Sequence, residues 1–200
     1  DVPAWPFAGL EPQAYQVIMA DPPWHYELRS EAGEGKSAQA QYRTMSLDAI
    51  AALPVADLAR DDCLLWLWAT APMLDQQMGV LKAWGFRFVS AGAWDKRRWG
   101  TGYVWRSRAE FVLLGKRGAP AVRGRGVPNL IEGGARGHSR KPDAAYAFAE
   151  RMLPGARRAS LFERPHRPGW DGWGDEYGRE PQRGRKAAPA AEAPELFRLG

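Results

Sequence analysis

A single stretch, Tyr15-Gln16-Val17-Ile18-Met19-Ala20 followed by Asp21-Pro22-Pro23-Trp24, gives the first indication of the fold. Its first six residues are an apolar run of strand length, and the two prolines after Asp21 end such a strand abruptly. We therefore predict a buried strand over residues 15–20 with Asp21 at its carboxyl end. Residues 24–45 show no hydrophobic periodicity, and a loop of that length inside a compact domain is usually functional.

The rest of the chain alternates between strand and helix patterns. Apolar runs predict further strands over residues 63–69, 86–94, 110–115, 129–131 and 158–162. Helical signals predict helices after the N-cap Ser46, over residues 72–84 before Gly85, and from Pro142 as first helical residue to 153. This alternation predicts an α/β fold with a mostly parallel sheet flanked by helices. Ligands of such sheets bind at the carboxyl ends of strands, here after Ala20 and after Phe162.

The composition indicates one globular domain over residues 1–177. Residues 178–200 are rich in Pro, Ala and Arg and predict a disordered tail. The sequence contains no run of 18 apolar residues, so no membrane-spanning helix is predicted. The single cysteine, Cys63, precedes an apolar run and is interpreted as a small buried hydrophobe, and a chain without a disulfide suits the cytoplasm. The histidines and the cysteine lack metal-ligand spacing, so no metal is expected.

Positive charge is concentrated in one segment. The whole chain carries a net +5, whereas residues 96–141 hold twelve Lys or Arg against Glu110 and Glu132. The segment is therefore +10 and the remainder −5. A basic segment that also carries Trp99, Tyr103 and Trp105 predicts nucleic acid as partner, although a solvated surface is the alternative. No Gly-x-Gly-x-x-Gly follows the first strand, which argues against a dinucleotide-binding oxidoreductase.

The turn at residues 21–24 combines groups that methylation of adenine requires. The N6 amine is a poor nucleophile because its lone pair is delocalised into the ring, so a catalyst must accept hydrogen bonds from both N–H groups. Asp21 offers a carboxylate, and Pro22 offers a carbonyl without a competing N–H. Pro23 stiffens the turn, and Trp24 offers a flat face for a base that is unpaired or has left the stack. An ordinary strand-to-turn junction is the alternative interpretation.

Further motifs follow the tetrapeptide in a fixed order: Tyr42-Arg43-Thr44-Met45-Ser46, Leu65-Trp66-Leu67-Trp68-Ala69-Thr70, Trp84-Gly85-Phe86, Trp94 with Lys96, Gly100-Thr101-Gly102-Tyr103, Ser139-Arg140-Lys141-Pro142-Asp143, Leu161-Phe162 with Arg164-Pro165, and Gly169-Trp170-Asp171 with Trp173-Gly174. With these motifs the chain from about residue 15 to 177 resembles the Asp-Pro-Pro-Trp family of S-adenosylmethionine-dependent N6-adenine methyltransferases. That family includes the eukaryotic messenger-RNA enzyme and bacterial and phage DNA enzymes.

The resemblance implies a Rossmann-like methyltransferase fold in circularly permuted order, with the catalytic strand first and the cofactor strand, residues 158–162, late. It implies S-adenosylmethionine as cofactor, Lys141 as partner of its carboxylate, and Asp21-Pro22-Pro23-Trp24 as the catalytic motif. Arg164 and His166 would hold the ribose. The full cofactor set it implies is Asp1, Val2, Ala20, Asp21, His25, Lys141, Arg164, Pro165, His166, Gly174, Asp175 and Glu176. For His25, a place in the loop without any cofactor contact is an equally good interpretation.

The target implied by the resemblance is adenine in DNA. The expected substrate contacts are Trp24, Tyr42, Lys96, Arg97, Arg98, Tyr103 and Arg106. Tyr42 would border the adenine pocket, and Glu110, at the start of a strand, would either anchor the active-site scaffold or have no role there. The amino-acid sequence of residues 139–143 resembles that of the bacterial and phage DNA enzymes more than that of the RNA enzymes.

The chain also departs from the family pattern. The common bacterial ending is Gly-Asn-Glu, whereas this chain has Gly174-Asp175-Glu176, and it lacks a separate target-recognition domain. Specificity would then come from residues 24–45 and 95–140 or from a partner, such as a second protein or a homodimer. The alternatives are the same reaction on RNA, a catalytically inactive nucleic-acid-binding module, and methylation of a small molecule or protein amide. The intact motif argues against the second and the basic segment against the third.

Overall fold

A seven-stranded sheet of order β5-β3-β4-β2-β1-β6-β7 forms the centre of the molecule. The computed structural model describes residues 5–25, 44–100, 104–123, 126–134, 140–162 and 166–174. The strands are β1 (Tyr15–Ala20), β2 (Ala59–Ala69), β3 (Arg87–Asp95), β4 (Ala109–Arg117), β5 (Leu130–Glu132), β6 (Arg158–Leu161) and β7 (Asp171–Trp173). The helices are α1 (Leu47–Ala51), α2 (Leu74–Ala83) and α3 (Asp143–Met152), with short 3-10 helices η3 (Val55–Asp57) and η4 (Ala71–Met73). No helix among these residues is long and apolar enough to cross a membrane.

The sheet is mostly parallel, as the sequence predicts. β1 pairs in parallel with β2 and β6, β6 with β7, and β3 with β5. Within the described chain, only β4 runs the other way, between β2 and β3. A direct connection from β3 to β4, without a crossover helix, produces this antiparallel pairing. The first residues of β4 therefore lie at the same edge as the carboxyl ends of its neighbours.

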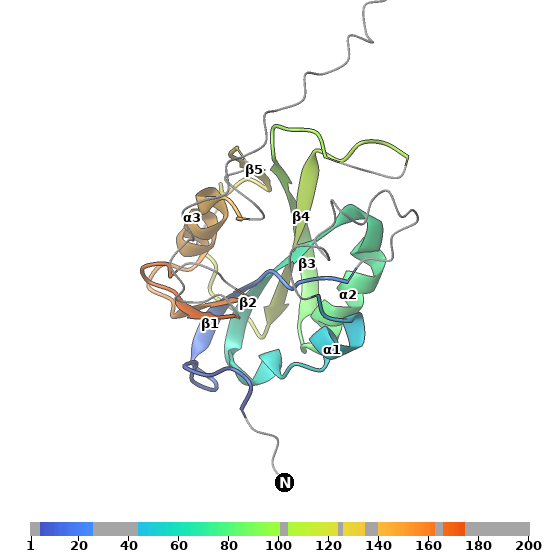
Figure 1. The fold of residues 1–200 in the computed structure, drawn as a ribbon. Coiled ribbons are helices and arrows are strands. Elements are labelled where there is room, and N and C mark those ends of the chain that lie inside the picture. The colour runs from blue at the N-terminus through green and yellow to red at the C-terminus, as the bar shows by residue number, and fades with distance from the viewer. Residues whose placement is uncertain are drawn as a thin grey trace, which may run out of the picture.

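Two helical layers cover the sheet, with α3 on one face and α1 and α2 on the other (Figure 1). Along β1, Val17 and Met19 pack with the residues under α3, whereas Ile18 and Ala20 pack with those under α1 and α2. Because both faces of the strand are buried, it is a continuous apolar run rather than an alternating one. Cys63 is buried, and burial raises the pKa of its thiol to about 12, which confirms its interpretation as a small hydrophobe.

Most of the predicted elements are confirmed. β1 has the predicted bounds, the Ser46 hydroxyl accepts a hydrogen bond from Ala49 N at the start of α1, and Gly85 adopts a φ of +79° after α2. Three details differ. β2 begins at Ala59, before the apolar run, Pro142 is the N-cap of α3 instead of its first residue, and β7 forms within a predicted loop. The predicted tail from residue 178 lies outside the described residues.

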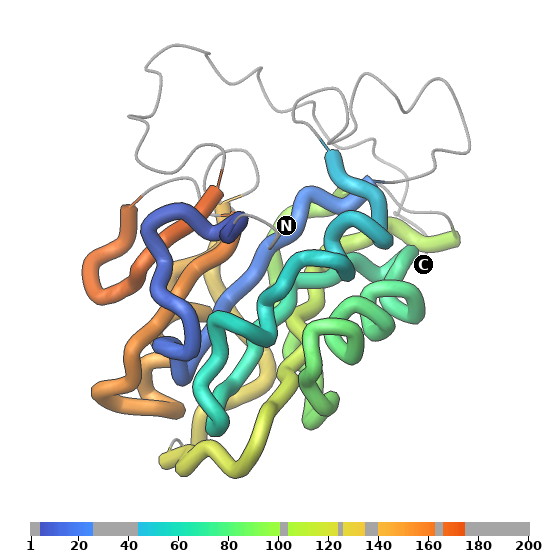
Figure 2. The backbone as a smooth tube through the Cα atoms, turned by 90° about the horizontal axis from the view of Figure 1, so that it is seen from below, coloured from blue at the N-terminus to red at the C-terminus, as the bar shows by residue number. Residues whose placement is uncertain are grey.

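The N-terminal segment before β1 lies against β6 and β7 (Figure 2). Arg157 is the central contact, with Nη1 at 2.6 Å from Glu11 and Nη2 at 3.2 Å from Asp171. The Tyr15 hydroxyl also donates to Asp171, at 2.9 Å. Phe7 packs edge-on against Trp173. These contacts hold the short strand β7 in register with β6 although it has only three residues.

Candidate active site

The carboxyl ends of three parallel strands lie level at one edge of the sheet. Ala20 of β1 is in register with Leu161 of β6, and Leu161 with Trp173 of β7. The backbone N–H of Asp21 donates to the Leu161 carbonyl at 3.3 Å, so the strand pairing continues into the motif. The two loops that the sequence marks as candidate ligand sites, after Ala20 and after Phe162, thus begin side by side.

Backbone hydrogen bonds hold the motif in one conformation. Trp24 N donates to the Pro22 carbonyl at 2.9 Å, which closes the turn. Met45 N donates to the Pro23 carbonyl at 2.9 Å, and His25 N donates to the Met45 carbonyl at 3.2 Å. The Pro22 carbonyl, which the sequence analysis proposes as an acceptor for the adenine amine, therefore already accepts one hydrogen bond within the turn. A carbonyl oxygen has two lone pairs, so Pro22 can still accept a second hydrogen bond from a ligand.

Trp24 anchors the motif in the core. Its side chain is 4% exposed, and its indole N–H donates to the Trp68 carbonyl of β2 at 3.1 Å. A buried indole needs a partner for its N–H, and this bond fixes the turn against the neighbouring strand. The predicted stacking of the target base on Trp24 gains no support from this burial and stays a prediction.

Four alternating charges connect the motif to the middle of the sheet. Lys141 Nζ lies 2.9 Å from Asp21 Oδ2 and 3.1 Å from Glu110 Oε2, and Lys96 Nζ lies 3.2 Å from Glu110 Oε1. Asp21 follows β1, Lys141 precedes α3, Glu110 is in β4 and Lys96 follows β3. Two positive and two negative groups leave no net charge, which makes their burial tolerable.

Lys141 is the central member of this chain of charges. Its side chain is 9% exposed, and Nζ lies over the Trp68 ring at 5.2 Å from the centroid. Burial by itself would lower the pKa of Lys141, but the Asp21 and Glu110 carboxylates outweigh it and hold the pKa above its ordinary value. Likewise, burial would raise the pKa of Glu110, but Lys141 and Lys96 together lower it. Lys141 is therefore a cation, and Glu110 an anion, at neutral pH.

Replacing Glu110 with Gln is expected to lower stability by about 1–3 kcal/mol at neutral pH, because two lysines lose a buried anionic partner. The pKa of Glu110 is below 4.5 in the folded protein, so its ionised form stabilises the fold above that pH. This contribution is lost as pH falls through the lowered pKa, where the neutral carboxyl resembles the amide. Urea unfolding of both proteins across pH should show a difference that shrinks in acid; a gap independent of pH would contradict the ion pairing.

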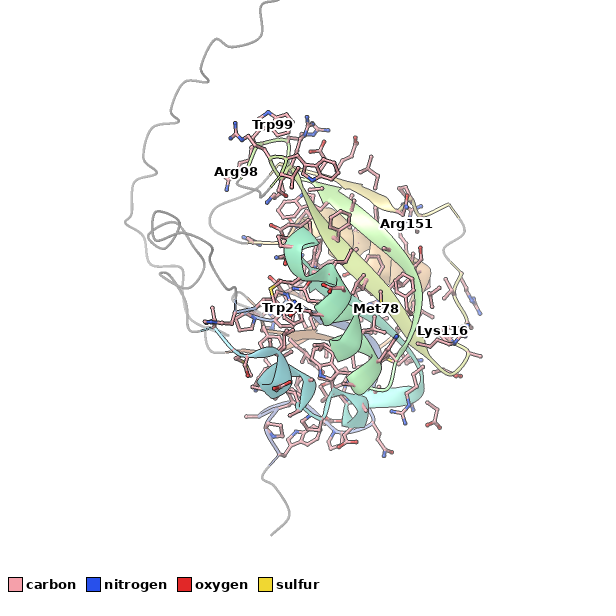
Figure 3. All side chains as sticks on the ribbon, turned by 90° about the vertical axis from the view of Figure 1, so that its right-hand side faces the viewer. Trp24, Met78, Arg98, Trp99, Lys116 and Arg151 are labelled. Carbon is pink, nitrogen blue, oxygen red and sulfur yellow. The ribbon has the colours of Figure 1, made fainter. Side chains whose placement is uncertain are left out.

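The basic segment of residues 96–141 does not form one surface. Because β4 is antiparallel, its first residues lie at the edge of Asp21, whereas Lys116 and Arg117 lie at the opposite edge, beside Arg87 and Cys63. Figure 3 shows Arg98 and Trp99 together at one end of the molecule, with Lys116 far from them. Strand direction therefore divides the described basic residues of the segment between two edges of the sheet.

The predicted substrate contacts other than Trp24 are one partly buried lysine, three exposed arginines and two tyrosines. Lys96 is 19% exposed and belongs to the chain of charges, so it is placed to hold Glu110 and not to face solvent like its neighbours. Arg97, Arg98 and Arg106 are exposed on the connection between β3 and β4. Tyr42 and Tyr103 lie outside the described residues. The role of all seven predicted residues in substrate binding stays a prediction.

The predicted cofactor contacts are only partly described. Ala20 and Asp21 lie at the level edge, and Gly174 follows β7 at the same edge. His25 is exposed, and its Nδ1 lies 3.0 Å from Thr44 Oγ1; His166 is also exposed. The remaining members lie outside the described residues: Asp1, Val2, Arg164, Pro165, Asp175 and Glu176. Across the part of the chain that is described, no three His, Cys, Asp or Glu side chains gather as metal ligands.

Trp68 is a site residue that the sequence interpretation missed. It lies in the apolar run of β2 and was predicted only as part of a core strand. In the structure its carbonyl accepts the Trp24 N–H, and its ring faces the Lys141 ammonium. No local signal separates Trp68 from its neighbour Trp66, because only tertiary packing brings Lys141 over one of the two rings.

Comparisons with family models and with curated proteins agree on one family. Residues 15–176 match the MT-A70 family. The chain is 35% identical over 187 residues to the type II methyltransferase M.MunI of Mycoplasma sp, covering 84% of this chain and 80% of that protein. It is 36% identical to the N(6)-adenosine-methyltransferase MT-A70-like protein of Drosophila melanogaster and 32% identical to the N(6)-adenosine-methyltransferase catalytic subunit METTL3 of Homo sapiens. Each of these two matches covers 78% of this chain, which spans only 26% and 27% of their lengths.

Proposed function

The chain belongs to the MT-A70 family of methyltransferases, and we propose that it transfers the methyl group of S-adenosylmethionine to the N6 amine of adenine in DNA. The observation that carries the proposal is the placement of Asp21. Its carboxylate stands at the carboxyl end of a central parallel strand, is 31% exposed, and is paired with the buried ammonium of Lys141. The cytoplasm is the proposed location, because the lone free cysteine Cys63 suits a reducing compartment.

The charged groups at this edge suit the amino-acid end of S-adenosylmethionine. That end carries a carboxylate and an ammonium, and Lys141 and Asp21 present the opposite charges 2.9 Å apart. A lysine ammonium has three donors, of which the ion pairs with Asp21 and Glu110 use two. The level ends of β1, β6 and β7 form the place where ligands of such sheets bind. When bound, the cofactor supplies an activated methyl group on its sulfonium.

The protein's own contribution is to hold the acceptors. The Asp21 carboxylate and the Pro22 carbonyl would accept hydrogen bonds from the two N–H groups of the adenine amine, which frees its lone pair. The Pro23–Met45 hydrogen bond and the Trp24–Trp68 hydrogen bond keep these acceptors in place. Lys141 orients the Asp21 carboxylate through their ion pair. Acceptors that are already oriented need no reorganisation as charge develops on the amine.

DNA is the proposed substrate class, and RNA is the second candidate. The match to M.MunI extends over most of both chains, and the spelling of residues 139–143 resembles the bacterial and phage enzymes. RNA is favoured by the relatives named N(6)-adenosine-methyltransferases. Their sequence identity to this chain is similar to that of M.MunI, but the chain spans only part of their length. The acceptor geometry serves either substrate, because the adenine amine is the same in both.

The test is transfer of labelled methyl from S-adenosylmethionine to single- and double-stranded DNA and RNA oligonucleotides of matched sequence. Digestion to nucleosides then identifies the product. We expect N6-methyladenine in DNA; label confined to RNA would keep the chemistry and change the substrate. Measured binding of the cofactor without label in any of the four substrates would contradict the proposed activity of the isolated chain.

A further inference from the structure

The connection between β3 and β4, which we call the 95–108 hairpin, projects from the edge that carries Asp21, and the structure describes its residues 95–100 and 104–108. Lys96 N donates to the Arg108 carbonyl at 3.1 Å, and Gly100 N donates to the Ser107 carbonyl at 2.6 Å. The Arg108 guanidinium donates two hydrogen bonds of 2.7 Å to the Asp95 carboxylate. These contacts continue the β3–β4 pairing beyond the sheet and hold the two described arms of the hairpin beside each other.

Large apolar side chains are exposed on this hairpin. Trp99 is 60% exposed, Trp105 is 83% exposed and Val104 is 96% exposed. Both indoles expose more than half of their surface, whereas most tryptophans elsewhere in the described chain are buried. Exposed aromatic side chains that cluster usually mark a binding surface, since water solvates them poorly. The hairpin therefore presents ring faces for a ligand.

The same hairpin is strongly basic. It holds five basic side chains and one acidic side chain, and Arg106 and Arg108 lie over the Trp99 ring at 6.0 and 5.9 Å from its centroid. Neither Arg98 nor Arg106 forms an ion pair with another described residue. Figure 3 shows Arg98 and Trp99 pointing away from the body of the protein. Arginines beside exposed indoles match a ligand that has both phosphates and accessible base faces.

We propose that the 95–108 hairpin is a stacking platform for an unpaired nucleic-acid strand, with Trp99 and Trp105 as the stacking side chains. The proposal rests on the proposed function, because it takes nucleic acid as substrate. In a duplex the base faces are already stacked, so a duplex would use only the arginines and leave the indoles in water. An unpaired strand uses both. The protein would thus take its adenine from single-stranded or locally opened nucleic acid.

The test measures binding of a short oligothymidine strand, about 12 nucleotides long, and of its duplex with oligoadenosine by fluorescence polarisation. Trp105→Ala and Trp99→Ala should each weaken binding of the single strand about tenfold, equivalent to about 1.4 kcal/mol, and change duplex binding much less. Trp105→Phe should retain most of the affinity. Phe88→Ala is the matched control, because Phe88 is a 38% exposed aromatic residue on β3 outside the hairpin.

Equal losses on the single strand and the duplex would overturn the proposal, as would unchanged binding of both. Unchanged binding together with loss of self-association in light scattering would assign the hairpin to a protein interface instead. The oligothymidine strand contains no adenine, so its binding does not depend on methyl transfer. Intact strand binding without N6-methyladenine formation would therefore sink the proposed function alone, whereas methylation with tryptophan-independent binding would sink this inference alone.

Discussion

Asp21→Ala is expected to reduce methyl transfer by about 100- to 1,000-fold while the protein remains folded. The carboxylate is one of two proposed acceptors for the adenine amine, and losing one oriented polar group in an active site typically has an effect of this size. The fold should persist because Asp21 lies beyond β1, and Lys141 keeps Glu110 as a partner. The initial rate of labelled methyl transfer, with circular dichroism as a check of folding, measures the effect.

Asp61→Asn is a suitable control for this experiment. Asp61 is an exposed carboxylate near the start of β2, at the end of the sheet away from Asp21. Its replacement should leave the rate within about twofold of the original, as for most surface changes. A folded Asp21→Ala variant with nearly full activity would refute the assignment of the carboxylate as an acceptor.

Lys141→Met is expected to cost about 3–5 kcal/mol of stability and to abolish activity. Removing one partner from a buried group of charges leaves excess charge of the other sign, here on Asp21 and Glu110, which would share only Lys96 as a cation of the group. In the original protein the pKa of Lys141 is raised above 10.5, so its stabilising effect is complete below that pH and is lost only as pH rises through the raised value. Chemical denaturation at neutral pH measures the loss.

The two remaining carboxylates give this prediction a second test. Without Lys141 they are stabilised by protonation, so the variant should regain relative stability as pH falls. The double variant Lys141→Met with Glu110→Gln should recover part of the loss at neutral pH, because Asp21 and Lys96 then leave the group without net charge. Lys82→Met, at an exposed lysine in the last turn of α2, is the control. A loss no larger than that of the control would contradict the central role of the Lys141 ammonium.

Much of the fold was accessible from local sequence. The β1 strand, the Ser46 cap and the Gly85 ending of α2 are each decided by neighbouring residues, through apolar run length, side-chain hydrogen bonding and backbone conformation. β7 was not accessible, because a three-residue strand has little preference of its own. It forms through pairing with β6, through the hydrogen bond from Tyr15 of β1 to Asp171, and through the packing of Phe7 against Trp173.

The candidate site divides in the same way. Asp21 at a strand end followed by two prolines is a local pattern, and with the family motifs it was sufficient to predict the reaction class. The sequence analysis offered Glu110 as an anchor of the active-site scaffold, but not the partners that it would have. The series of ion pairs Asp21–Lys141–Glu110–Lys96 was not predictable, since its members come from four separate segments of the sequence. The burial of Trp24 and the position of Trp68 under Lys141 likewise depend on how the helices and strands pack.

The sequence alone therefore determined the alternation of strands and helices, the position of the motif and the family of the protein, because each depends on short runs of residues and their order. The tertiary structure decided which charges meet and which side chains face solvent. The main physical cause of this arrangement of charges is the antiparallel direction of β4, which places Glu110 beside Lys141 and Lys116 at the opposite edge. The same strand direction carries the 95–108 hairpin and its exposed tryptophans to the edge where Asp21 lies.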